Sequence, residues 1–315
     1  MQRRPLGRSG LELAPLVFGG NVFGWTADKA TSHAMLDAFV DAGFNAIDTA
    51  DSYSTWVPGN VGGESETIIG EWLAGRGRRD DVLILTKVGS DMGQGHKDLS
   101  PEWIARSVEG SLKRLRTDYI DLYQSHWDDP RIPFEDVLGA YQRLIEQGKV
   151  RAIGASNLSP ERLAEALDVS ARLGLPRYES IQPRYNLYDR GDFEGGLQAL
   201  CLDRQVGAIS YYSLASGFLT GKYRSEADLG KSARGGGVKD YLDAKGLRIL
   251  SALDEVAAAH GATPAQVALA WAVAQPGLTA PIASATSVAQ LNETMKAATL
   301  TLSADDLREL DQASR

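Results

Sequence analysis

Short apolar runs and amphipathic segments alternate along most of the chain. Each of eight runs is rich in aliphatic and β-branched residues, and between the runs lie stretches with apolar positions at helical spacing. The runs are residues 17–19, 45–48, 82–87, 119–123, 150–153, 180–182, 208–211 and 278–282. Strands that alternate with helices predict a parallel sheet with right-handed crossovers. Eight such units favour a closed α/β (β/α)8 TIM barrel over an open sheet.

The segments between these runs carry start and stop signals for helices. Serine or threonine followed by proline opens several of them, as in Ser100-Pro101, Ser159-Pro160 and Thr263-Pro264. The predicted helices are residues 32–41, 64–76, 100–115, 134–147, 159–173, a part of 193–204, 241–260, 263–274 and a final helix capped by Ser303. Turn residues at 6–11 predict an N-terminal β-hairpin. No linker divides the chain, so we expect residues 1–315 to form a single barrel domain with extra helices.

Composition narrows the classes of protein that fit this pattern. The 315 residues are 43% hydrophobic and 23% charged, which is typical of a globular protein. A net charge of −8 argues against broad nucleic-acid binding. Cys201 is the only cysteine, and neither a signal peptide nor a membrane-spanning run is visible, so we expect a cytoplasmic protein. The four histidines are scattered, and we expect no metal site.

Polar residues at the ends of three successive predicted strands suggest an active site. Asp48, Lys87 and His126 are spaced 39 residues apart, and catalytic groups of such barrels lie at the C-terminal strand ends. Tyr53 follows on the loop after Asp48 and is placed to fold back over it. Taken singly, each residue has a structural explanation: a loop or cap aspartate, a salt-bridged lysine, or a hydrogen-bonded histidine. Their joint placement favours a catalytic role for the group over these structural explanations.

The four side chains make chemical sense as a proton donor and its supports. A lysine ammonium beside Tyr53 would lower the pKa of the phenol, and Asp48 would keep that lysine charged. His126 would donate a hydrogen bond to a carbonyl oxygen. Such a group suits protonation of an oxygen that becomes negative while hydride arrives at carbon, and the hydride must come from a cofactor.

Several motifs in order resemble the aldo-keto reductase family over nearly the whole chain. The segment Gly43-Phe44-Asn45-Ala46-Ile47-Asp48-Thr49-Ala50-Asp51-Ser52-Tyr53 resembles its first signature, and Gly63-Glu64-Ser65-Glu66 its continuation. Further matches are Thr86-Lys87, Leu122-Tyr123-Gln124-Ser125-His126, Ile153-Gly154-Ala155-Ser156-Asn157, Gln182-Pro183-Arg184-Tyr185-Asn186 and the stretch from Ser213 to Tyr223. The resemblance implies an NAD(P)(H)-dependent carbonyl reductase or alcohol dehydrogenase.

The resemblance also assigns residues to roles. Tyr53 would be the general acid, Lys87 its partner, Asp48 the support of the lysine, and His126 the group that orients the substrate carbonyl. Ser156, Asn157 and Gln182 would hold the nicotinamide carboxamide, with Tyr211 stacked on the ring. The further implied cofactor contacts are Gly20, Asn21, Leu214, Ser216, Gly217, Leu219, Lys222, Ser284, Ala285, Thr286, Gln290 and Glu293.

Three features depart from the family pattern or lie outside it. Thr286 stands where many relatives carry an arginine for the adenosine 2′-phosphate, so NADP(H) is favoured by family habit while NAD(H) stays open. Phe23, Trp25, Trp56 and Trp127 lie on loops at the catalytic rim and suggest an aromatic substrate pocket. Residues 230–238 (GKSARGGGV) predict a mobile loop, with a possible role as a flap over the cofactor.

Two other functions stay open on the sequence. One is a barrel lyase that uses Lys87 to form a Schiff base. The other is a cofactor-binding regulatory subunit, since the chain also resembles the reductase-like β subunits of potassium channels. The expected partner of the leading hypothesis is a small carbonyl substrate. The physiological substrate and the oligomeric state are not determined by the sequence.

Overall fold

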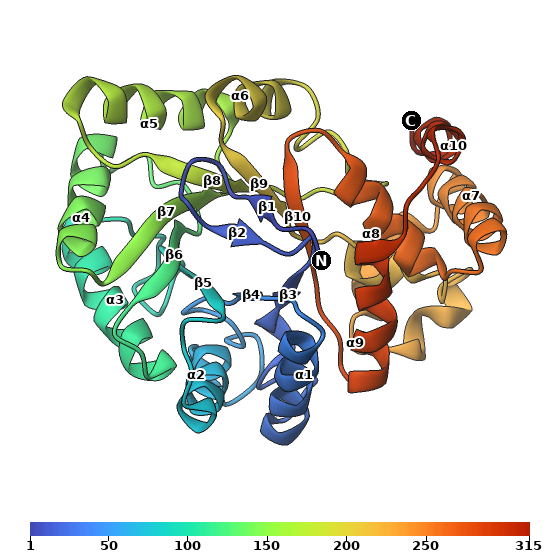
Figure 1. Ribbon diagram of the computed structural model, residues 1–315, viewed down its shortest axis with the longest axis horizontal. Coiled ribbons are helices and arrows are strands. Elements are labelled where there is room, and N and C mark those ends of the chain that lie inside the picture. The colour runs from blue at the N-terminus through green and yellow to red at the C-terminus, as the bar shows by residue number, and fades with distance from the viewer.

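The eight predicted strands close into a parallel barrel (Figure 1). The computed structural model describes residues 1–315. The barrel strands are β3 (Val17–Gly19), β4 (Ala46–Asp48), β5 (Leu83–Val88), β6 (Ile120–Ser125), β7 (Val150–Ser156), β8 (Tyr178–Gln182), β9 (Gly207–Ser210) and β10 (Leu278–Ala283). They pair in chain order from β3 to β10, and β10 pairs with β3 to close the barrel. The predicted (β/α)8 fold is confirmed.

Helices surround the barrel on its outside (Figure 1). They are α1 (Lys29–Asp41), α2 (Glu64–Arg76), α3 (Pro101–Leu115), α4 (Phe134–Glu146), α5 (Pro160–Leu173), α6 (Gly196–Arg204), α7 (Ala244–His260), α8 (Pro264–Ala274), α9 (Val288–Met295) and α10 (Ala304–Ser314). Buried apolar side chains of strands and helices form one large cluster between the two layers. None of the helices combines the length and the apolar character needed to span a lipid bilayer.

The predicted hairpin is present and covers one end of the barrel. Its strands are β1 (Arg4–Pro5) and β2 (Glu12–Leu13). Gly7 adopts a φ of +55° beside Glu179, near the start of β8, and a Cβ at this position would collide with the Glu179 carbonyl oxygen. Leu6 and Leu13 of the hairpin belong to a second apolar cluster that fills the barrel interior. The hairpin therefore blocks the N-terminal end, and the opposite rim is left for chemistry.

The structure differs from the sequence expectation at three places. Helix α1 begins at Lys29, earlier than predicted, because the Asp28 carboxylate caps it by accepting from the Thr31 N–H. Helix α9 was not predicted; Ser287 caps it within a stretch that looked like a cofactor motif. The segment 230–238 is largely built into two short 3₁₀ helices, η3 (Glu226–Lys231) and η4 (Gly235–Tyr241).

Candidate active site

The predicted site residues lie together at the C-terminal rim of the barrel. Each belongs to the end of its strand or to the first residues after it, so a parallel barrel points them to the same face. They are Asp48 of β4, Lys87 of β5, His126 after β6, Ser156 and Asn157 at the end of β7, Gln182 of β8 and Tyr211 after β9. The strand-end positions that the sequence predicted therefore lie on one rim of the barrel.

Lys87 is fully buried and lies at the centre of a polar cluster. Its ammonium Nζ donates to Asp48 Oδ2 at 2.7 Å, to the Thr49 carbonyl oxygen at 2.8 Å and to the Tyr53 hydroxyl at 2.8 Å. The Tyr53 hydroxyl in turn lies 3.1 Å from Asp48 Oδ2. Three acceptors around one nitrogen match the three N–H bonds of an ammonium group. Tyr53 has thus folded back over Asp48, and its hydroxyl is held between both charges.

The second carboxylate oxygen of Asp48 is held by two amides. Gln182 Nε2 donates to Asp48 Oδ1 at 2.9 Å, and Gln124 Nε2 lies 3.5 Å from the same atom. Gln124 was missed by the sequence reasoning, although strand register predicts it: it pairs directly with Lys87 across β5 and β6. The amides fix the carboxylate plane, so Asp48 presents Oδ2 to Lys87 and Tyr53.

The protonation of Tyr53 follows from its surroundings. Burial, and after it the nearby Asp48 carboxylate, raise the pKa of Tyr53 well above its ordinary value. The sequence reasoning expected the opposite direction because it counted Lys87 alone. Burial lowers the pKa of Lys87, while the ion pair with Asp48 offsets part of this effect. Tyr53 therefore keeps its proton at neutral pH.

His126 lies beside the same cluster as a neutral ring. Its ring centroid is 6.1 Å from that of Tyr53, and the two planes are close to perpendicular. Burial, with the charges of Lys87 and Lys97, lowers the pKa of His126 well below its ordinary value. Nδ1 lies 3.0 Å from the hydroxyl of Ser90, a contact that sequence reasoning missed. No group of three His, Cys, Asp or Glu side chains lies close enough together to hold a metal ion.

Three of the four predicted pocket aromatics lie at this rim. Trp25 and Trp56 contact each other edge to face with centroids 5.8 Å apart, and Trp56 is 6.0 Å from Tyr53. The Trp127 ring stacks on His126 at 5.6 Å. Phe23 is different: it is fully buried and packs edge-on against Phe18, so it supports the loop and lines no open surface.

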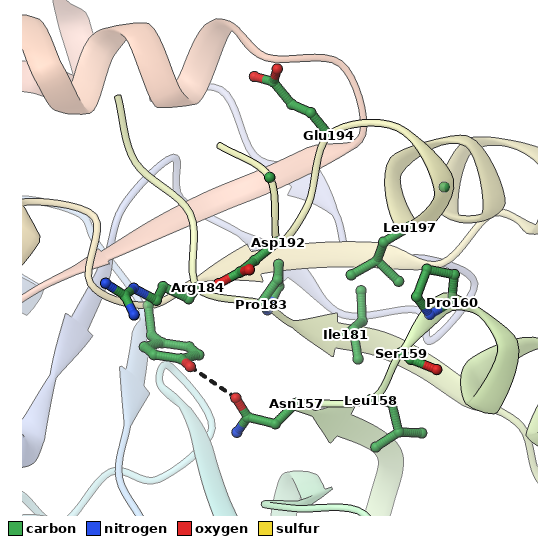
Figure 2. Close-up of a pocket in the computed structure, with 13 residues that line it drawn as sticks. Asn157, Leu158, Ser159, Pro160, Ile181, Pro183, Arg184, Asp192, Glu194 and Leu197 are labelled. Atoms are coloured by element: carbon green, nitrogen blue, oxygen red, sulfur yellow. Dashed lines mark hydrogen bonds between the residues drawn. The ribbon is translucent and has the colours of Figure 1, made fainter. Parts of the chain in front are cut away.

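A pocket of about 370 Å³ is lined by two of the predicted nicotinamide residues, Asn157 and Tyr211 (Figure 2). The Tyr211 hydroxyl donates to Asn157 Oδ1 at 2.8 Å, which is the dashed line in Figure 2. Asn157 Nδ2 donates to the His126 carbonyl oxygen, and Ser156 Oγ donates to that of Gln182. Tyr211 faces the barrel, whereas Tyr212 is half exposed, so Tyr211 is the residue that could stack on a ring.

The early and late predicted cofactor segments meet where β10 pairs with β3. Ser284 Oγ donates to Asn21 Oδ1, and a Cβ on Gly19 would collide with Ser284, so these segments are in direct contact. Thr286 donates through its backbone and its hydroxyl to Gln290 Oε1. The remaining residues of this group are Gly20, which is buried beside the Ser65 hydroxyl, Ala285, which is buried, and Glu293, which pairs with Lys296. Thr286 and Gln290 are both uncharged, and they are hydrogen-bonded to each other.

Lys222 of the predicted pyrophosphate loop and Arg234 of the 230–238 segment are two cations that form no ion pair. Lys222 makes no salt bridge, and its Nζ lies 5.0 Å from the Tyr223 ring. Arg234 of the 230–238 segment lies over Trp25 at 5.2 Å, and its Nη2 is buried with no hydrogen-bond partner. The remaining loop residues are Leu214, partly buried, Ser216 and Gly217, both with φ above +50°, and Leu219, fully buried. A buried unpartnered cation fits an anionic ligand.

Comparison with known proteins identifies the family of the chain. Residues 15–315 match the model of the Aldo/keto reductase family. The chain is 35% identical to "Uncharacterized oxidoreductase YrpG" of Bacillus subtilis, over 99% of this chain and 95% of that protein. It is 34% identical to a "Probable voltage-gated potassium channel subunit beta" of Oryza sativa (94% and 91%) and 32% identical to "L-glyceraldehyde 3-phosphate reductase" of Escherichia coli K12 (99% and 92%). The chain therefore belongs to the aldo/keto reductase family of oxidoreductases, which act on small carbonyl compounds with nicotinamide cofactors.

Proposed function

We propose that this chain reversibly reduces an aldehyde or ketone to an alcohol, with Tyr53 as the general acid. One observation carries the proposal: Tyr53, a partly exposed residue at the C-terminal rim of the barrel, receives a 2.8 Å hydrogen bond from Lys87 at its hydroxyl. A phenol in this position can give its proton to a ligand oxygen while the ammonium stabilises the phenolate that remains.

The proton step can be written from these residues alone. A nicotinamide cofactor, when bound, would supply the hydride that the carbonyl carbon accepts. The carbonyl oxygen takes the Tyr53 proton, so the phenol O–H bond breaks and an alcohol O–H bond forms. Lys87 already donates to the phenol oxygen, and Asp48 holds the ammonium in line. In the reverse direction, the phenolate accepts the alcohol proton.

Residues on both sides of the rim fit a nicotinamide dinucleotide. Ser156, Asn157 and Gln182 offer amide and hydroxyl groups for the carboxamide, and the Tyr211 ring offers a stacking surface. Lys222, whose Nζ lies 5.0 Å from the Tyr223 ring, and Arg234 have no carboxylate partner, which suits an anionic diphosphate. The other proposed contacts are Gly20, Asn21, Leu214, Ser216, Gly217, Leu219, Ser284, Ala285, Thr286, Gln290 and Glu293.

Thr286 offers a direct test of cofactor preference. Thr286→Arg adds a cation where Thr286 and Gln290 now bond each other, and we expect it to favour NADPH over NADH by about tenfold. Tryptophan fluorescence, titrated separately with each cofactor, measures both dissociation constants. Thr301→Arg, on an exposed residue elsewhere, controls for the added charge. Equal tightening of both cofactors would contradict a contact with the 2′-phosphate.

The proposed activity is tested by cofactor binding and turnover together. Trp25, Trp56 and Trp127 around Tyr53 favour aromatic aldehydes, so we expect NADPH oxidation with members of such a panel and quenching of tryptophan fluorescence by the cofactor. Failure of both NADPH and NADH to bind would overturn the proposal. Binding without any turnover would instead support a regulatory subunit, a role suggested by the name of the rice relative.

The geometry around Lys87 argues against the Schiff-base alternative. An amine that attacks a carbonyl must be neutral and must have a free lone pair. Lys87 Nζ is surrounded by three acceptors, one of them the Asp48 carboxylate at 2.7 Å. This arrangement supports an ammonium ion that donates three hydrogen bonds, and borohydride should therefore trap no substrate on Lys87.

A further inference from the structure

The hydroxyl of Ser90 connects His126 to two other side chains. Ser90 follows strand β5, is almost fully buried, and its Oγ lies 3.0 Å from His126 Nδ1. Trp127 Nε1 donates to the same oxygen at 3.2 Å, and the Ser52 hydroxyl donates to it at 3.2 Å. Four side chains from three successive strand ends thus meet at one oxygen atom.

Counting protons at this oxygen fixes the direction of each bond. An indole N–H can only donate, so Ser90 accepts from Trp127, and it accepts a second hydrogen bond from Ser52. Both lone pairs are then occupied, and the single hydroxyl proton of Ser90 is left for His126 Nδ1. A ring nitrogen that accepts a hydrogen bond carries no proton. Because His126 is neutral, its proton resides on Nε2.

The other ring nitrogen is free to meet a ligand. His126 Nε2 has no hydrogen-bond partner, yet it is not one of the buried polar atoms that lack a partner. This nitrogen is therefore exposed at the rim. The imidazole plane is held by the stacked Trp127 ring at 5.6 Å, whose own face is covered by Lys97. Asn157 fixes the backbone by donating to the His126 carbonyl oxygen at 2.9 Å. Orientation and tautomer are therefore set by different neighbours.

We propose that Ser90 is a positioning residue that holds His126 as the Nε2–H tautomer, so that the ring presents a donor to the carbonyl oxygen beside Tyr53. This inference rests on the proposed function. The alternative tautomer would place a nitrogen lone pair against the lone pairs of the carbonyl oxygen, and it would oppose the negative charge that develops there. Trp127 and Ser52 act through Ser90. Because their hydrogen bonds occupy both lone pairs of the Ser90 oxygen, only the hydroxyl proton is left to interact with His126.

The test compares variants that remove or keep the hydroxyl. We expect Ser90→Ala to lower kcat for carbonyl reduction by roughly tenfold, with an unchanged dissociation constant for NADPH. Ser90→Thr keeps the hydroxyl and should restore most of the loss. Ser170→Ala removes a part-buried hydroxyl far from the rim and should retain wild-type kcat. Nitrogen-15 NMR of the imidazole should show Nε2–H in the wild type and in Ser90→Thr, and a shift toward Nδ1–H in Ser90→Ala.

Two results would overturn the inference. One is an imidazole spectrum of Ser90→Ala identical to that of the wild type, even with a reduced kcat, because the effect would then be structural. The other is a wild-type spectrum with the proton on Nδ1. The spectra need no turnover, so a wild-type protein that binds cofactor but reduces nothing would refute the proposed activity while NMR still decides the role of Ser90.

Discussion

Tyr53→Phe is expected to bind the nicotinamide cofactor with wild-type affinity and to lose roughly 10²–10⁴-fold in kcat. The substitution removes only the hydroxyl that lies 2.8 Å from Lys87 and 3.1 Å from Asp48. The ring itself stays, and with it the packing against Trp56 and His126. Steady-state kinetics with an aromatic aldehyde, combined with a fluorescence titration by NADPH, separates the chemical step from binding.

A second tyrosine provides the matched control for that variant. The Tyr119 ring packs under two arginines just before strand β6, at the end of the barrel opposite to the active site. Tyr119→Phe therefore deletes a hydroxyl without touching the rim, and its kcat should equal that of the wild type. Turnover by Tyr53→Phe within twofold of the wild type would contradict the acid role and would leave the Lys87 cluster without a proton to deliver.

Periodicity predicted the barrel because each short strand shows a single pattern, an apolar run that ends in polar residues. Runs such as 82–87 are apolar up to their last residues, and the polar residues that follow mark the rim. The hairpin was visible from its turn residues. Helix α9 was missed because its cap, Ser287, lies in a stretch whose polar residues looked like ligand contacts. The local sequence pattern does not distinguish a residue that caps a helix from a residue that contacts a ligand.

The missed site residues share a different property. Gln124 and Arg234 lie inside segments that the sequence singled out, yet neither was assigned a role, and Ser90 lies in no motif; each matters through a partner distant in the sequence. Gln124 is accessible to prediction through strand register, since it lies opposite Lys87. Ser90 and Arg234 depend on loop conformation, which side-chain pattern does not encode. The direction of the Tyr53 pKa also needed the structure, because burial and Asp48 outweigh the neighbouring ammonium.

The net charge of the whole chain was also a poor guide to the class of ligand, because it does not show how charges are arranged around the site. The chain carries a net charge of −8, yet Lys222 and Arg234 are left without carboxylate partners. Local fields around a partly buried site decide whether an anion binds, since distant surface charges are screened by salt. A net negative charge therefore does not argue against the proposed binding of an anionic cofactor at Lys222 and Arg234.

Asp51→Asn is expected to stabilise the protein at pH 8 and to have little effect at pH 4. The Asp51 side chain is 3% exposed, and its Oδ1 has no hydrogen-bond partner. Burial, and then the neighbouring Glu66 carboxylate, raise its pKa to about 8, while Arg114 and Lys87 act in the opposite direction. An unfolded aspartate titrates near ~3.9, so at intermediate pH the folded state alone holds the proton.

The sign of the pH dependence follows from that difference in proton binding. Below about pH 4 the carboxyl is protonated in both states, and its contribution to stability is fully present. As the pH rises toward 8, the unfolded state releases its proton while the folded state keeps it, so the free energy of unfolding falls, by up to about 5 kcal/mol. An asparagine does not titrate, and the variant should lose this slope. Urea unfolding at pH 4, 6 and 8 measures it.

A second buried carboxylate should respond in the opposite direction. Asp121 accepts hydrogen bonds from Arg79 at 2.6 Å and from Arg151 at 2.9 Å, and its side chain is fully buried. Asp121→Asn would leave the largely buried Arg79 guanidinium without its counter-charge, which costs about 3–5 kcal/mol at pH 8. Burial is common to both residues, and only the partners differ. Equal slopes of stability against pH in wild type and Asp51→Asn would show that Asp51 is already ionised at neutral pH, with its charge balanced by Arg114 and Lys87.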